Sequence, residues 1–158
     1  MLELTVVVGL VVLTSGACSL FEAVLYSAPL AEIDALERAG RPSGAILRRL
    51  RSHVDRPIAA ILSLNTVANT GGAALAGAIA ARVLGSVSIG YFSAAFTLAI
   101  LLFSEIIPKT TGVIYARRLA GPVARTEPDV RRYSPANQTR IVALFAGAGA
   151  VFGWGGGP

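Results

Sequence analysis

The sequence predicts an all-α integral membrane protein with three transmembrane helices and a cytoplasmic pair of amphipathic belt helices. Hydrophobic residues make up 54% of the 158 residues and charged residues 15%, with a mean hydropathy of +0.65. A domain of this size cannot bury so much apolar surface in its own core, so lipid must cover much of it. Three long apolar runs and an uneven distribution of basic residues then give the number of spans and their orientation.

Three runs have the length and composition of membrane spans. The first, Leu4 to Phe21, is close to the roughly 20 residues that a helix needs to cross about 30 Å of hydrocarbon. The second, Ile58 to Ala81, is rich in alanine and glycine, which allow helices to approach closely. A short connector, Arg82 to Gly90, leads to the third, Tyr91 to Ile107, which we expect Pro108 to end or kink.

The basic residues orient these spans. Of the fourteen Lys and Arg residues, all but Arg82 lie either between the first two runs or after the third. The positive-inside rule therefore places the N-terminus outside and the C-terminus in the cytoplasm, as expected for a multi-pass protein of the plasma membrane. The basic residues flank apolar runs and lack interleaved aromatic residues, so no nucleic-acid partner is indicated.

The segment between the first two spans is amphipathic. Leu30 to Arg51 carries apolar residues near helical spacing, and Gly40, Pro42 and Gly44 divide it in two. We expect this pair of helices to lie on the inner membrane surface with its arginines toward the lipid headgroups. A solvated, charged linker is the alternative interpretation.

Polar side chains interrupt the apolar runs near their predicted cytoplasmic ends. They are Ser19 and Glu22 in the first, Ser63, Asn65 and Asn69 in the second, and Glu105 in the third. At a rise of about 1.5 Å per residue, Asn65 and Glu105 fall at a similar depth. Asn65 and Asn69 are four residues apart and so share one helix face.

These side chains offer the ligands that a hard cation prefers. Carboxylate, hydroxyl and amide oxygens suit Mg²⁺ and Ca²⁺, and Pro108 frees backbone carbonyls upstream of it. Asn and Ser also serve as hydrogen-bonding groups between membrane helices, and Glu105 with Lys109 can form a simple i,i+4 ion pair. A carboxylate inside a membrane helix nevertheless favours a functional role.

The residues do not indicate an enzyme. The single histidine, His53, lies in the predicted cytoplasmic connector, and no serine in the spans is placed beside a plausible base. The sequence has no glycine-rich phosphate-binding loop with a following Lys and Ser or Thr. A single cysteine, Cys18, cannot build a disulfide framework or a cysteine-based zinc site.

Three separated stretches resemble the transmembrane domain of the CNNM/CorC proteins, a family associated with efflux of Mg²⁺ and cobalt. The stretches are Ser19 to Ala23, Ile61 to Asn69, and Ser104 to Thr110, of which the last is the most specific. The resemblance covers residues 1–125. It implies a homodimer in the lipid bilayer, with three spans per protomer and a cation bound without its water shell among them.

Carried over by position, the resemblance gives four cation ligands and two second choices. The ligands are Ser19, Asn65, Asn69 and Glu105, and the second choices are Ser63 and the backbone near Ser104. Glu22, Pro108 and Lys109 are assigned to structure or gating, with Glu22 paired to a basic group and Lys109 balancing Glu105 when no ion is present. The implied function is transport of Mg²⁺, with Na⁺ as a candidate coupling ion. A non-transporting membrane scaffold, or a truncated remnant of such a transporter, is the alternative.

The sequence departs from the family pattern after Arg125. Residues 126–158 are expected to be an atypical tail, truncated or disordered, whose apolar run Ile141 to Trp154 is too short to span. The paired CBS nucleotide-binding module that usually follows in the family is not in this sequence, so regulation by ATP cannot be carried over from the family.

Overall fold

The fold is a bundle of helices. The computed structural model describes residues 1–52 and 54–126. Its elements are α1 (Leu2–Ser27), α2 (Leu30–Arg38), α3 (Pro42–Ser52), α4 (Asp55–Ala99), the π-helix η1 (Ile100–Ile106), α5 (Ile107–Ile114) and α6 (Ala116–Thr126). All elements in this part of the chain are helical, which confirms the all-α prediction. Apart from residue 126, the predicted tail lies outside the described residues.

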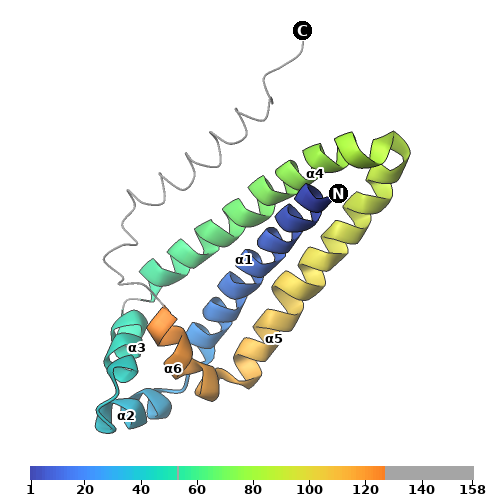
Figure 1. Cartoon of the computed structure of the whole chain (residues 1–158). Coiled ribbons are helices and arrows are strands. Elements are labelled where there is room, and N and C mark those ends of the chain that lie inside the picture. The colour runs from blue at the N-terminus through green and yellow to red at the C-terminus, as the bar shows by residue number, and fades with distance from the viewer. Residues whose placement is uncertain (53, 127–158) are drawn as a thin grey trace.

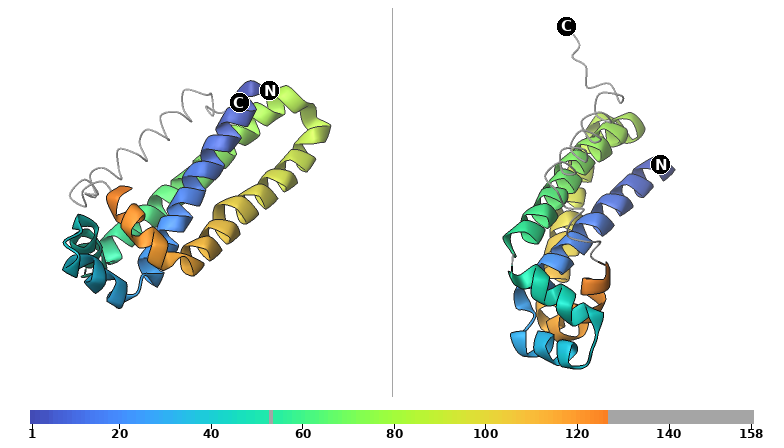
Figure 2. Two further views of the ribbon diagram at one scale, coloured as in Figure 1. Left: turned by 60° about the horizontal axis from the view of Figure 1, so that its bottom comes forward. Right: turned by 90° about the vertical axis from the view of Figure 1, so that its left-hand side faces the viewer.

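Three helical stretches in the described ranges are long and apolar enough to cross a membrane: Leu2–Ser27, Pro57–Leu84 and Ser88–Ile114. Each contains one of the three predicted spans, so the chain has the architecture of a membrane protein with three spans. α1 lies against α4 and against the η1–α5 arm, and these long segments run side by side (Figure 1). The short helices α2, α3 and α6 gather at one end of the spans in every view (Figure 2).

The connector expected at Arg82 to Gly90 lies between the second and third spans, and it is helical. The helical backbone of α4 continues from Asp55 to Ala99, and its ribbon bends back on itself between the second and third spans (Figure 1). A helical path keeps the backbone N–H and C=O groups paired close to the hydrocarbon, where unpaired groups are costly. The helix therefore continues through the glycines and serines of this segment, although both residue types have a lower helix propensity than alanine in water.

The sequence predicted that Pro108 would end or kink the third span, and in the structure it does not end it. The π-helix η1 precedes it, and Ile107 donates its N–H to Leu102 O, five residues earlier. This change of register makes Pro108 a first-turn residue of α5, where a missing N–H costs no helical hydrogen bond. The helix then continues to Ile114.

The division of the amphipathic segment into two helices is confirmed. Gly40 adopts φ 65°, a left-handed conformation that favours glycine, and ends α2. The N–H of Gly40 donates to Glu37 O at 2.9 Å and that of Arg41 to Leu36 O at 3.0 Å, which together form a Schellman motif. Arg48 of α3 pairs with Asp34 and Glu37 of α2, so ion pairs hold the two helices together.

Two apolar clusters form the core and leave a polar layer between them. One joins the C-terminal part of α1, from Cys18 onward, to α2, α3, α6 and the start of α4 up to Ile61. The other joins the N-terminal part of α1, up to Val11, to α4 from Ala76 onward. Between the clusters lie the buried Ser15 on α1 and the predicted site residues Asn65 and Asn69 on α4, and the predicted Ser19 directly follows Cys18.

A candidate cation site among the three spans

Asn65 joins all three spans through its side chain. Its Oδ1 accepts a 2.6 Å hydrogen bond from Ser15 Oγ of α1, and its Nδ2 donates to Glu105 Oε1 of η1 at 3.4 Å. Asn65 is 9% exposed and Ser15 is fully buried. The structure therefore brings Asn65 and Glu105 together at one level, as predicted, and adds Ser15 to them.

Two further oxygen atoms on the same helix faces are buried and have no hydrogen-bond partner among residues 1–52 and 54–126: Ser19 Oγ and Asn69 Oδ1. Ser19 follows Ser15 by four residues and Asn69 follows Asn65 by four, so each lies one turn from the hydrogen-bonded pair. An unpaired buried polar group costs about 1–3 kcal/mol, so such atoms call for a partner.

Ser19 and Asn69 lie on opposite sides of the Ser15–Asn65 bond along the spans. α1 and α4 run in opposite directions (Figure 1). Ser19, one turn after Ser15, therefore lies toward one end of the bundle, and Asn69, one turn after Asn65, lies toward the other. The polar side chains thus form a column rather than a single ring. An ion at the Asn65 level would have unpaired oxygens one turn away in each direction.

Lys109 links the network to a second carboxylate. Its Nζ lies 3.3 Å from Glu105 Oε2 and 3.6 Å from Glu22 Oε2 of α1. The side chain of Glu22 is 17% exposed, that of Glu105 29% and that of Lys109 43%. Lys109 is thus the basic partner of Glu22 and also makes the i,i+4 pair with Glu105 that the sequence suggested.

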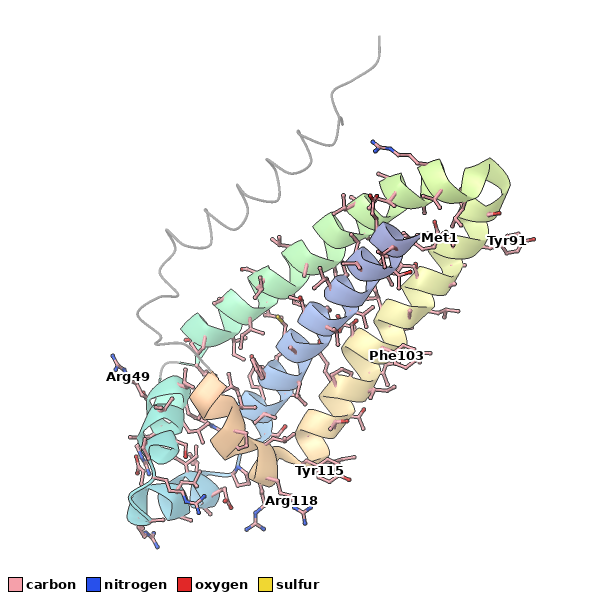
Figure 3. All side chains as sticks on the ribbon, viewed as in Figure 1. Met1, Arg49, Tyr91, Phe103, Tyr115 and Arg118 are labelled. Carbon is pink, nitrogen blue, oxygen red and sulfur yellow. The ribbon has the colours of Figure 1, made fainter. Side chains whose placement is uncertain are left out.

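The π-helix places a backbone carbonyl close to α1. A Cβ added to Gly16 would lie 3.2 Å from Phe103 O, so only glycine leaves normal room there. If the five-residue spacing of the Ile107–Leu102 bond continued, Phe103 O would accept a hydrogen bond from the N–H of residue 108. That residue is Pro108, which has no N–H. The Phe103 ring points outward (Figure 3), whereas its carbonyl faces the inside of the bundle.

Ser104 also ties η1 to α1. It is fully buried, and its Oγ donates a 3.2 Å hydrogen bond to Val12 O. Ser104 and Gly16 together fix the π-helix against α1, next to Glu105. This packing positions the carboxylate of Glu105 toward Asn65.

Ser63 lies apart from the network. It is exposed, and its Oγ donates a 2.7 Å hydrogen bond to Ala59 O of its own helix. Ser15, by contrast, is a site residue that the sequence reasoning missed. The i,i+4 spacing of Ser15 and Ser19 mirrors that of Asn65 and Asn69, and this repeat was the available signal.

The donor set is mostly neutral. In the described part of the chain, no group of three His, Cys, Asp or Glu side chains is arranged to hold a metal ion. Oxygen ligands would therefore come from hydroxyls, amides and backbone carbonyls together with Glu105. Such a set suits a hard cation and does not suit zinc or copper.

A family model covers this whole network. Residues 6–126 match the cyclin M transmembrane N-terminal domain, CNNM. The chain belongs to the CNNM family. The matched range contains every residue from Ser15 to Lys109 that forms the polar column, so the site lies in the part of the chain that defines this CNNM domain.

Curated relatives of this CNNM chain come from bacteria and a plant. It is 41% identical over 120 residues to UPF0053 protein sll1254 of Synechocystis sp., a match that covers 76% of this chain and 35% of that protein. It is 36% identical over 84 residues to the chloroplastic DUF21 domain-containing protein At1g55930 of Arabidopsis thaliana, covering 53% and 13%. It is 26% identical over 87 residues to the UPF0053 inner membrane protein YfjD of Escherichia coli K12, covering 55% and 20%. The chain spans about a third of the Synechocystis protein and less of the other two.

Proposed function

We propose that this CNNM domain transports a divalent cation, Mg²⁺, across the plasma membrane through a site among α1, α4 and η1. The observation that carries the proposal is the convergence of Ser15, Asn65 and Glu105 from three spans at one buried level. The family is associated with divalent cation transport, and this site lies in the region that defines it. We assign Asn65 and Glu105 as ligands of the ion at this level, and Ser19 and Asn69 as ligands one turn away in each direction along its path.

The chemistry of Mg²⁺ explains why both charge and neutral oxygens are needed. Mg²⁺ gives up its water reluctantly, so an ion that enters a site between helices needs oxygen atoms to replace that water. The unpaired Ser19 Oγ and Asn69 Oδ1 and the Phe103 carbonyl provide neutral oxygens, and Glu105 provides the charge. A single carboxylate holds the ion less tightly than several would, which favours its release.

The remaining parts of the proposal concern the assembly. The N-terminus faces the outside, the C-terminus faces the cytoplasm, and the protein acts as a homodimer in the lipid bilayer with Na⁺ as the coupling ion. The distribution of basic residues supports this orientation, since Arg49 of α3 and Arg118 of α6 lie at the same end of the spans (Figure 3).

Flux into liposomes tests the proposal. The purified chain is reconstituted into vesicles that contain a fluorescent Mg²⁺ indicator, and the initial rate is measured after external Mg²⁺ is added. We expect Glu105→Gln and Asn69→Ala to lower the rate by at least about tenfold, equivalent to about 1.4 kcal/mol. Ser63→Ala is the matched control, because the exposed hydroxyl bonds only to its own helix. Unchanged flux in both site variants would end the proposal.

A non-transporting scaffold is the second candidate function. One observation favours it: both oxygens of Glu105 already have partners, Asn65 and Lys109, as in a purely structural ion pair. A scaffold would form the same dimer and show no heat of Mg²⁺ binding in titration calorimetry. Stabilisation of the purified chain by Mg²⁺ would count against it.

A further inference from the structure

We propose that Lys109 is a built-in competitor for the cation site, and that Glu22 holds its ammonium group whenever a divalent cation occupies Glu105. This inference rests on the proposed transport function and deepens it. It assigns a role to two residues that are not ligands of the ion.

The geometry places one ammonium group between two carboxylates from different helices. Lys109 Nζ lies 3.3 Å from Glu105 Oε2 on η1 and 3.6 Å from Glu22 Oε2 on α1. Lysine carries its charge on a flexible four-carbon stem, so the ammonium can shift from one carboxylate to the other without a change in the backbone. Glu22 is less exposed than Glu105, so it is held within the bundle as a fixed second position.

The charges explain why an exchange is needed. Without an ion, Lys109 neutralises Glu105, which would otherwise be an unpaired carboxylate among the spans. A divalent cation bound to Glu105 repels an ammonium only a few ångströms away. Glu22 then offers the ammonium a partner, so the ion does not have to expel a positive charge into an apolar environment.

The same charges set the affinity. Glu22, Glu105 and Lys109 together carry a net charge of −1 when all three are ionised, and a bound divalent cation changes this to +1. Without Lys109 the group would carry −2 and bind the ion more tightly. Lys109 therefore lowers the affinity and promotes release.

Titration calorimetry with MgCl₂ on the purified full chain in detergent tests this exchange. We expect Lys109→Met to tighten Mg²⁺ binding by about tenfold, because a competing positive charge is removed. Glu22→Gln is expected to weaken binding, because the ammonium is then confined to Glu105. Lys109→Arg keeps the charge and is the matched control, with an affinity near that of the wild type. Lys109→Gln serves as a second neutral variant if Lys109→Met does not fold.

The double variant separates exchange from simple charge effects. If Glu22 acts by holding Lys109, then Glu22→Gln weakens Mg²⁺ binding much less once Lys109 is Met than it does in the wild type, because only its direct attraction for the ion is then lost. Additive effects of the two substitutions, or neutral Lys109 variants that bind Mg²⁺ no more tightly than the wild type, would overturn the inference and leave the transport proposal standing. A wild-type chain that binds no Mg²⁺ would overturn both.

Discussion

The hydroxyl of Ser15 donates a 2.6 Å hydrogen bond to Oδ1 of Asn65, although 50 residues separate the two in sequence. This bond fixes how α1 and α4 face each other and uses one of the two lone pairs of the amide oxygen. The donor side of the same amide is thereby turned to Glu105. A single side chain thus sets the level at which the three spans meet.

Removal of this amide should destabilise the bundle. In Asn65→Ala the buried Ser15 hydroxyl loses its acceptor and Glu105 loses a donor, so we expect a loss of about 1–3 kcal/mol. The measurement is the apparent melting temperature of the purified protein in detergent. Ser63→Ala is the control and should melt close to the wild type, since its hydroxyl is exposed. Equal melting of the two variants would mean that the Asn65 network adds no stability.

Close packing of the third span on α1 depends on Gly112. A Cβ at this position would lie 2.6 Å from Ala23 Cβ and 3.0 Å from Leu20 O, so Gly112→Ala must push α5 away from α1. We expect a loss of about 1–3 kcal/mol, measured as a lower melting temperature.

Gly9→Ala is the matched control for this substitution. A Cβ at Gly9 meets no atom within 4 Å, and alanine favours a helix over glycine by about 1 kcal/mol. Gly9→Ala should therefore leave the melting temperature unchanged or raise it. A drop as large as that of Gly112→Ala would show that loss of flexibility, not overlap, is the cause.

The C-terminal end of α1 depends on Arg51. The Nη1 of Arg51 donates to the carbonyls of Ala28 and, at 3.3 Å, of Leu25, which lie where α1 ends. A positive side chain at a helix C-terminus stabilises it by about 0.3–1 kcal/mol, and its hydrogen bonds add to this. We expect Arg51→Met to increase hydrogen exchange at the amides of residues 25–28 and of Leu30.

Arg49→Met provides the comparison. Arg49 is exposed on α3 and points away from the spans (Figure 3), so its loss should not change exchange at the end of α1. Similar exchange in the two variants would indicate that the hydrogen bonds of Arg51 do not hold this end of the helix.

Much of the fold could be predicted because it depends on composition and local signals. The three apolar runs predicted the spans, since length and hydrophobicity alone decide whether a helix can cross the bilayer. Gly40 predicted the break between α2 and α3, because its left-handed conformation is one that glycine adopts readily. The contact between Asn65 and Glu105 followed from depth, as both lie at a similar distance from the cytoplasmic end of their spans.

The rest depends on contacts between helices that the sequence does not show. The spacing of Ser15 and Ser19 is visible in the sequence, but the bond from Ser15 to Asn65 on α4 is not. The π-helix before Pro108 packs closely against Gly16 of α1, and this contact between distant segments is not visible in the sequence. The position of Lys109 between Glu22 and Glu105 depends on the angle at which α5 meets α1, and the sequence does not give this angle.

The most direct test of a cation site at Glu105 is a thermal-shift titration of the detergent-purified chain with Mg²⁺, in parallel with Ca²⁺, Mn²⁺ and Na⁺. A ligand that binds the native state raises the apparent melting temperature as its concentration rises. We predict a saturable increase with Mg²⁺ for the wild type that Glu105→Gln abolishes and Ser63→Ala retains. An equal increase in wild type and Glu105→Gln, or none in the wild type, would contradict the account.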